Sequence, residues 1–258
     1  MIALARQLRS QVGYDLLAFR RNPAAAFFTV VLPLIFLLLF TSIFGNDVLE
    51  GRDGLRAATF YVPGILALAI ISATMVNLAM TTVTRREDGV LKRVRGTPLQ
   101  PWIFVLALAV ASLVITAVMT ALVILIGRVL FDVALPARGV PALLVTVLVA
   151  AIAFSAMGLA LSVIIPSVEA APAITNAVVL PLYFISDVFI VTDSTPRFLR
   201  VLGDLFPVRH LTRALVRSFD PNTAGTLLPW THWAVIAAWG VVAGIVVARR
   251  FRWTPWGT

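Results

Sequence analysis

Six apolar runs, each long enough to cross a lipid bilayer as a helix, constrain this chain more than any other feature. A crossing helix needs about 20 apolar residues at a rise of about 1.5 Å each. The runs span residues 24–44, 60–83, 102–127, 140–165, 173–191 and 229–248. Prolines inside them, such as Pro33 and Pro181, predict kinks, because neighbouring helices can satisfy the backbone groups that proline frees. The sequence therefore predicts an all-α integral membrane protein with six transmembrane helices.

Composition supports the membrane class. Hydrophobic residues make up 60% of the 258 residues and charged residues only 13%, which is more apolar surface than a soluble domain could cover. The formal net charge of +9 raises the question of nucleic acid. However, the basic residues lie in short clusters beside apolar runs, which is typical of membrane orientation and not of a phosphate-binding face. We expect the lipid bilayer, and no nucleic acid, as a partner.

The distribution of lysine and arginine favours cytosolic termini. With the N-terminus inside, twelve of the 21 basic residues lie in inner segments, crowded against the ends of spans. The other nine lie outside, five of them in the long connection 192–228, where such residues carry less weight. We expect a multi-pass protein of the cell (inner, cytoplasmic) membrane with both termini in the cytosol.

Two segments are expected outside or beside the spans. Residues 1–22 carry apolar residues three or four positions apart: Leu4, Leu8, Val12, Leu16 and Phe19. This spacing predicts an amphipathic helix on the inner membrane surface, and Asn22-Pro23 then turns the chain into the transmembrane domain of residues 23–258. Residues 192–228 predict two short helices separated at Pro207, which we interpret as an outer cap or a re-entrant helical hairpin.

The loop 84–101, with the sequence RREDGVLKRVRGTPLQP from Arg85 onwards, is compact and basic. Glu87 and Asp88 precede a run, 89–95, that can form about two helical turns, and Gly96-Thr97-Pro98 ends it. The basic residues could serve only as orientation signals that touch anionic lipid. An ordered helix between two spans suits a docking surface for a soluble partner better, and we adopt that interpretation.

Signs of enzyme chemistry are absent from the sequence, and we expect no catalytic residue and no metal site. A phosphate-binding loop ends in Gly-Lys-Ser/Thr, whereas Lys92, the single lysine, is flanked by Leu91 and Arg93. His210 and His232 lack the spacing of zinc ligands. We therefore expect this chain to bind no cofactor itself.

Polar residues in or beside the spans are candidates for a transport pathway or an outer gate. Asn77, Asn176 and Asp187 lie within apolar runs, where polar groups are costly and often functional. The asparagines could equally form hydrogen bonds between helices, and Asp187 could be an interfacial carboxylate. Arg209, Arg213 and Arg217 recur every fourth residue, which could attract an anionic substrate or headgroup or could reflect snorkelling to the interface.

Two phrases in this chain resemble a known family. RREDGVLKRVRGTPLQPW between spans two and three, and FPVRHLTRALVRSF before span six, are similar to recurrent phrases in the membrane subunit of ABC-2 type exporters, the daunorubicin-exporter-like permeases. The resemblance covers essentially the whole chain. One departure is that Thr212 and Arg213 stand where the second phrase often has an acidic residue.

The resemblance implies a half-transporter that exports a hydrophobic or amphipathic compound such as a drug, lipid or polyketide. Two copies, or one copy and a related subunit, would pair. Two separate ATPase subunits would bind ATP and Mg. The segment 89–97 would be the coupling helix. Residues implied in ATPase coupling are Arg85, Arg86, Glu87, Gly89, Leu91, Lys92, Arg93, Thr97 and Pro98. Residues implied in the pathway or outer gate are Asn77, Asn176, Asp187, Pro207, Arg209, His210 and Arg213.

Two alternatives remain open on the sequence. One is a secondary transporter driven by an ion gradient, in which Asp187 would be the coupling carboxylate, although the sequence has no internal repeat of the kind such folds often show. The other is a membrane scaffold that holds partners together without transporting anything.

Overall fold

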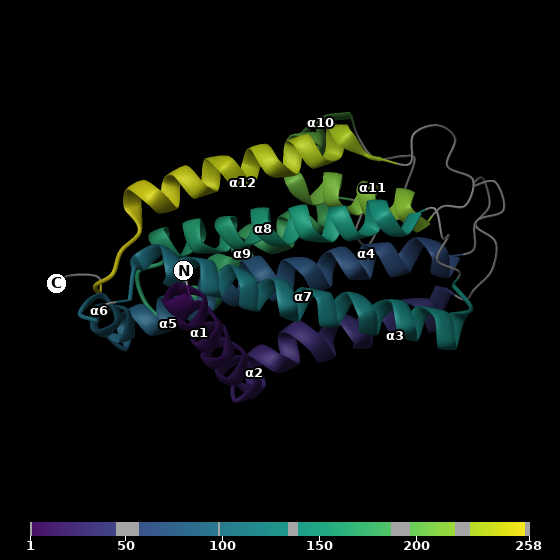
Figure 1. The fold of residues 1–258 in the computed structure, drawn as a ribbon. Helices are drawn as coiled ribbons and strands as arrows, with labels where there is room; N and C mark the ends of the chain where they lie inside the picture. Colours follow the sequence, from purple (N-terminus) through teal and green to yellow (C-terminus); the bar gives the residue numbers. More distant parts are fainter. Residues whose placement is uncertain are drawn as a thin grey trace.

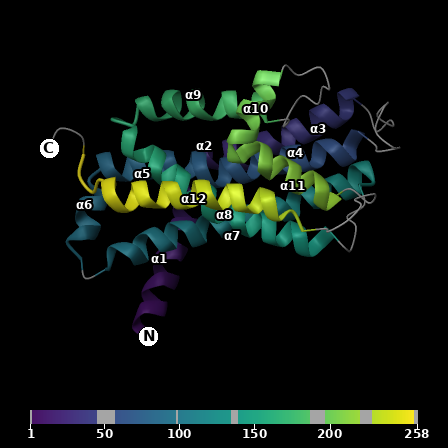
Figure 2. The same ribbon diagram turned by 90° about the horizontal axis from the view of Figure 1, so that it is seen from above.

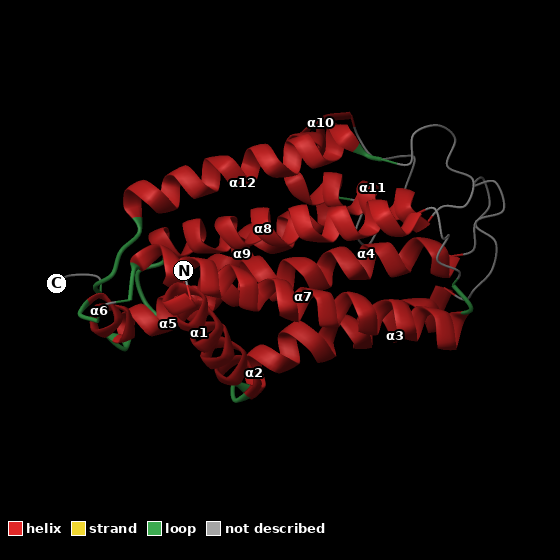
Figure 3. Ribbon diagram, viewed as in Figure 1, coloured by secondary structure: helices red, strands yellow, loops and turns green. Residues whose placement is uncertain are grey.

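The computed structural model describes residues 2–44, 57–97, 99–133, 139–186, 197–219 and 228–255. Within these residues every regular element is a helix and no strand is present (Figures 1 and 3). The predicted all-α fold class is confirmed for this part of the chain. Two residues that the sequence singled out, Pro98 and Asp187, lie outside the described residues.

The helices form a bundle whose members run between two ends (Figure 1). In chain order they are α1 (Ile2–Arg20), α2 (Pro23–Ala26), η1 (Phe27–Val31), α3 (Leu32–Phe44), α4 (Ala57–Ile71), η2 (Ser72–Val76), α5 (Asn77–Glu87), α6 (Val90–Arg95), α7 (Pro101–Phe131), α8 (Val140–Ile164), α9 (Ala170–Ile185), α10 (Arg197–Leu205), α11 (Pro207–Phe219) and α12 (Trp230–Arg250). The turns η1 and η2 are π-helical and continue directly into their neighbours, so α2–η1–α3 and α4–η2–α5 are each one continuous helical segment. We call the end that carries α6 the basic end and the end that carries α10 and α11 the opposite end.

Five helical segments are long and apolar enough to cross a membrane. They are Pro23–Ile43, Tyr61–Glu87, Pro101–Phe131, Val140–Ile164 and Trp230–Arg250. Each corresponds to one of the six predicted spans. A multi-pass integral membrane protein is therefore the architecture that the structure supports.

The remaining predicted span, 173–191, corresponds to α9. This apolar helix has 16 residues and ends at Ile185, so it is about 24 Å long, whereas the hydrocarbon core of a bilayer is roughly 30 Å thick. Residues 187–191 of that predicted span lie outside the described residues. The count of six spans stays a prediction.

The second span lies at the centre of the bundle. Side chains of α4 and η2 from Val62 to Met75 are almost all buried in one apolar core, which α3, α7, α8 and α11 complete. α8 approaches this span closely at Gly158, where an added Cβ would lie 2.5 Å from the carbonyl oxygen of Met75. The first and last spans are mostly exposed, so their apolar side chains face lipid or a partner.

In the first span, a π-helical turn accompanies Pro33. Pro33 has no N–H to offer the carbonyl of Thr29 four residues earlier, and η1 ends immediately before the turn that contains Pro33. The wider π-helical turn lets the helix continue past the missing hydrogen bond. Pro181 lies within α9, which continues through it to Ile185.

The N-terminal helix α1 crosses the bundle direction and projects away from the other helices (Figure 2). It packs against α7. Leu8, Val12, Leu16 and Phe19 of the predicted apolar stripe are half-buried, while Leu4 is exposed. The Asn22 side chain accepts a hydrogen bond of 3.0 Å from the amide of Ala25, which caps α2 and starts the first span.

The segment before the last span contains the two helices that the sequence predicted around Pro207. α10 ends at Leu205 and α11 begins at Pro207. α11 is largely buried against α4, α8 and α12, whereas α10 packs on α9 and α11. Two consecutive helices separated at Phe206 are thus present at the opposite end, and a hairpin that re-enters the membrane remains a prediction.

Candidate functional site at the basic end

A tight turn positions α6 at the end of α5. Asp88 closes α5, and Gly89 follows in the left-handed region with φ +70°, which non-glycine residues rarely adopt. The Thr97 hydroxyl then donates 2.7 Å to the carbonyl of Val94 and accepts 3.3 Å from the amide of Leu99. The predicted helix over 89–95 is confirmed as Val90–Arg95, and both of its ends are fixed by local chemistry.

One side of α6 is anchored in an apolar cluster. Leu91 is fully buried together with Leu78, Phe104, Leu108 and Leu159. Trp253, which follows the last span, packs on the same cluster with its ring 5.9 Å from that of Phe104. Three distant parts of the chain therefore hold this short helix in place, which its own length could not do.

The other side of α6 is exposed and basic. Lys92, Arg93 and Arg95 all point to solvent, and Arg93 reaches back with an Nη2 to O distance of 3.4 Å to the carbonyl of Asp88. An apolar anchor under an exposed row of cations is the arrangement that a docking helix needs. Lys92 and Arg93 were expected in coupling and are exposed, and Arg95, which was not among the expected coupling residues, is exposed beside them.

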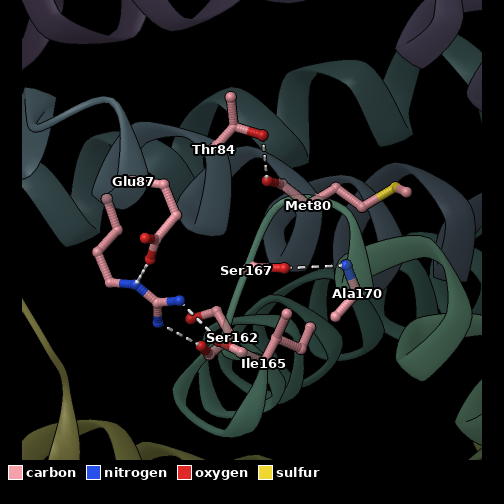
Figure 4. A network of polar contacts seen from close by, with 8 residues as sticks. Met80, Thr84, Glu87, Ser162, Ile165, Ser167 and Ala170 are labelled. Carbon is pink, nitrogen blue, oxygen red and sulfur yellow. Dashed lines mark hydrogen bonds and ion pairs between the residues drawn. The ribbon is translucent and has the colours of Figure 1, made fainter. Parts of the chain in front are cut away.

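Arg86 lies in the opposite situation. Its side chain is 2% exposed, and its guanidinium donates 2.9 Å to the carbonyl of Ser162 and 2.6 Å to that of Ile165. Its Nε pairs at 2.8 Å with the Glu87 carboxylate. Figure 4 shows Glu87 and the end of α8 converging on this point. Arg86 therefore caps the C-terminus of α8 from within and presents no charge to a docking partner in this structure.

Arg85 joins the basic end to the N-terminal helix. Its Nη1 lies 2.6 Å from Oδ1 of Asp15, a buried carboxylate that also accepts from Gln11 at 3.3 Å. Burial raises the pKa of the Asp15 carboxyl above its ordinary value, and the charge and hydrogen bond of Arg85 oppose that shift only in part. Within the described part of the chain, Oδ2 of Asp15 has no hydrogen-bond partner.

At the opposite end, polar side chains connect α10 with α11 and α11 with α12. Asp204 of α10 accepts from Arg213 at 2.7 Å and lies 3.6 Å from Arg209. His210 contacts the Asp204 carbonyl through Nε2 at 2.8 Å and Nδ1 of His232 through its own Nδ1 at 2.8 Å. Because Arg209 is 2% exposed and Arg213 is exposed, the arginine repeat does not form one open stripe.

The two asparagines lie on neighbouring helices. Asn77 begins α5, is half-buried, and accepts 3.4 Å from the hydroxyl of Thr81. Asn176 lies on α9, which packs against α5, and its side chain is exposed. Among the residues that the structure describes, no three His, Asp or Glu side chains are grouped to hold a metal ion.

The family of this chain is identified by its match to a protein-family model. The protein-family model described as ABC-2 type transporter matches residues 6–219. This chain belongs to the ABC-2 type transporter family. It is thus a membrane permease of the ABC class, whose permease subunits carry no ATPase domain of their own.

Curated relatives have names that agree. This ABC-2 permease is 27% identical over 238 residues to the daunorubicin resistance ABC transporter permease protein DrrB1 of Streptomyces coeruleorubidus, covering 90% of this chain and 78% of the relative. It is 22% identical over 211 residues to the putative transport permease YvfS of Bacillus subtilis strain 168, covering 81% of this chain and 84% of the relative.

The structure of the permease also reveals contacts that sequence reasoning missed. Asp15 was absent from the expected site, although it lies three residues after Val12 and four before Phe19 and so shares their side of α1. The partners of Arg86 are backbone carbonyls, which leave no residue signal in a sequence. His232 was considered only as a metal ligand, and its contact with His210 depends on how α11 meets α12.

Proposed function

We propose that this permease is the membrane subunit of an exporter that moves a hydrophobic or amphipathic compound out of the cytoplasm, driven by ATP that separate ATPase subunits hydrolyse. The observation that carries the proposal is α6, a helix anchored by buried Leu91 that presents Lys92, Arg93 and Arg95 to solvent. A soluble subunit can exert force on a membrane protein only through an ordered contact, and α6 provides one.

The proposed assembly contains two ATPase subunits, with their ATP and Mg, and two permease subunits, either two copies of this chain or one copy and a related chain. The exposed apolar faces of the first and last spans support a membrane location with lateral partners. We place the basic end in the cytosol of the cell membrane, because Lys and Arg beside span ends are retained on that side. Helix α1, before the first span, packs at the basic end, and so does Trp253 after the last span. Both contacts support two cytosolic termini.

The mechanism that we propose is a population shift. Binding of ATP closes the ATPase pair, and α6 transmits the closure, moving the permease from an inward-accessible to an outward-accessible state. A ligand shifts such an equilibrium only through contacts that differ between the states. The exposed cations of α6 supply contacts of this kind, while Gly89 and Thr97 fix the direction in which the helix points.

For the pathway we propose the side of the permease where α5 and α9 meet. Asn77 is half-buried there and Asn176 is exposed, and an exposed amide on an apolar helix is costly against lipid. A second permease subunit or a substrate would relieve that cost. The pair α10 and α11, with Pro207 at its turn and His210 in contact with His232 of α12, would form a hairpin that closes the outer exit by re-entering the membrane. The name of the Streptomyces relative refers to resistance to daunorubicin, which supports a drug-like substrate class for this permease.

The proposal is tested by co-expressing the permease with a candidate ATPase and measuring complex formation and ATP-dependent export from vesicles. Arg93→Glu reverses a charge on α6, so we expect loss of the complex and of export. Arg128→Glu is the matched control, because Arg128 is equally exposed but ends α7 at the opposite end. Equal effects of the two variants would contradict docking at α6. Export that survives without nucleotide and stops when the proton gradient collapses would favour the ion-coupled alternative instead.

A further inference from the structure

Arg86 is one of the largest fully buried side chains among the described residues, and it is charged. A buried guanidinium is tolerated only when its donors are satisfied. Here they are satisfied by the carboxylate of Glu87 and by the carbonyls of Ser162 and Ile165, at distances between 2.6 and 2.9 Å. The last turn of α8 has carbonyls without helical partners and a negative dipole end, so the cation complements it.

The position of Arg86 in the fold gives this contact its significance. Arg86 is in the last turn of α5, three residues before Gly89, so it moves with the start of α6. Ser162 and Ile165 lie 76 and 79 residues further along the chain. They end α8, and a connection of residues 165–169 leads to α9, where the Ser167 hydroxyl accepts 3.3 Å from the amide of Ala170 (Figure 4).

We propose that Arg86 is a positioning residue that transmits the movement of α6 to α8 and α9, and that it does not touch the ATPase. The inference rests on the proposed function, since it assumes that an ATPase moves α6. Displacing α5 relative to α8 would leave two nitrogens of the buried guanidinium and two carbonyls without hydrogen-bond partners, so the two helix ends move together. Through the short connection, the movement reaches α9 and its exposed Asn176.

The planar fork of arginine is what this role requires. Two nitrogens of one guanidinium reach two different carbonyls, and the third nitrogen meets Glu87. Lysine carries the same charge on one compact ammonium and cannot hold that geometry. Arg86→Lys therefore separates charge from geometry, and Arg86→Gln removes the charge. Arg128→Gln removes an exposed arginine at the opposite end and serves as the matched control.

The first measurement is functional, in the reconstituted complex with its ATPase. For Arg86→Lys and Arg86→Gln we expect binding of the ATPase as in the natural protein, and export per ATP hydrolysed reduced by about tenfold or more. Arg128→Gln is expected to retain both ATPase binding and coupling. Arg93→Glu should instead lose binding itself. Natural coupling in Arg86→Lys, or loss of ATPase binding in Arg86→Gln to the extent seen in Arg93→Glu, would overturn the inference.

The second measurement follows the movement directly and does not depend on a variant that folds poorly. The natural chain has no cysteine, so Gly96→Cys at the end of α6 and Ala177→Cys on α9, both exposed, can carry a pair of spin labels. Labelled permease is diluted with unlabelled permease so that only distances within one subunit are read. We expect the α6–α9 distance of the natural background to stay the same with and without trapped nucleotide, and to shift or broaden with Arg86→Gln.

A nucleotide-dependent change of that distance with Arg86 intact would overturn the inference. The proposed function fails in a different way: the natural permease would then show no ATPase binding and no dependence of export on ATP. The two failures are therefore distinguished before any Arg86 variant is made.

Discussion

Replacing Gly158 by alanine tests a close contact between α8 and η2 in the core. The added Cβ would lie 2.5 Å from the Met75 carbonyl oxygen, 2.9 Å from its Cα and 3.1 Å from its carbonyl carbon. All three are backbone atoms, so no side-chain rotation relieves the clash, and α8 must move away from η2 by close to 1 Å to reach ordinary contact. Overpacking of a well-packed core costs about 1–3 kcal/mol.

The net effect is smaller because alanine favours helix. Glycine within a helix is destabilising by roughly 0.5–1 kcal/mol relative to alanine. The balance for Gly158→Ala is therefore a destabilisation of about 1–2 kcal/mol. Gly244→Ala in α12 is the matched control, because nothing lies within 4 Å of an added Cβ there and only the helix gain applies.

Thermal unfolding of the detergent-solubilised permease, followed by tryptophan fluorescence, measures both changes. With about 2–4 °C in Tm for each kcal/mol in a chain of this size, Gly158→Ala should lower Tm by about 4 °C. Gly244→Ala should leave Tm unchanged or raise it by about 2 °C. Equal Tm values for the two variants would refute the backbone contact between α8 and η2. Recovery of Tm on adding Met75→Ala would also refute it, because that change removes no backbone atom.

Two further predictions concern the supports of the basic end. Gly89→Ala places a side chain at φ +70°, which costs about 1–2 kcal/mol and changes the direction of α6, so stimulation of the ATPase should fall. Gly96→Ala is the control: an added Cβ there has its nearest neighbour at 3.4 Å, and stimulation should be retained. The pKa of Asp15 is raised by burial, so the folded protein binds more protons than the unfolded chain, and Tm should decrease as pH rises through the interval between the ordinary and the raised pKa. Asp15→Asn should flatten that part of a Tm-against-pH profile, and Arg85→Gln should extend it to higher pH; an unchanged profile in Asp15→Asn would contradict the assignment.

The parts of this fold that depend on one segment at a time were predictable. Apolar run length sets helix length through a fixed rise per residue, so five spans agree with the structure. Gly89 and Gly96 bracket α6, and Pro207 separates α10 from α11, because the backbone preferences of glycine and proline act locally. α9 was harder, because its described part ends at Ile185 and composition alone does not tell a short helix from the beginning of a span.

The contacts that organise the site depend on pairs of segments, and the sequence could not supply them. Arg86 carries the same charge as Arg93 in the same loop, yet one is buried and the other exposed. Their exposure differs because the C-terminus of α8 lies beside Arg86, which is a property of the folded bundle. The structural role of Asp15 likewise depends on its contact with Arg85, 70 residues away.

At the basic end, residues that carry the same charge therefore have different structural roles. Orientation in a membrane counts every Lys and Arg near a span end alike, and that rule treats the whole loop as one cluster. The structure divides the cluster: Arg85 holds α1 through Asp15, Arg86 holds α8, and the basic residues of α6 are the exposed ones. Exchanging arginine for lysine preserves the charge that sets orientation, but at Arg86 it loses the fork of hydrogen bonds to Ser162 and Ile165. Insertion and coupling are thus separable properties of one charged loop, because insertion depends on the sum of its charges and coupling on where each charge lies.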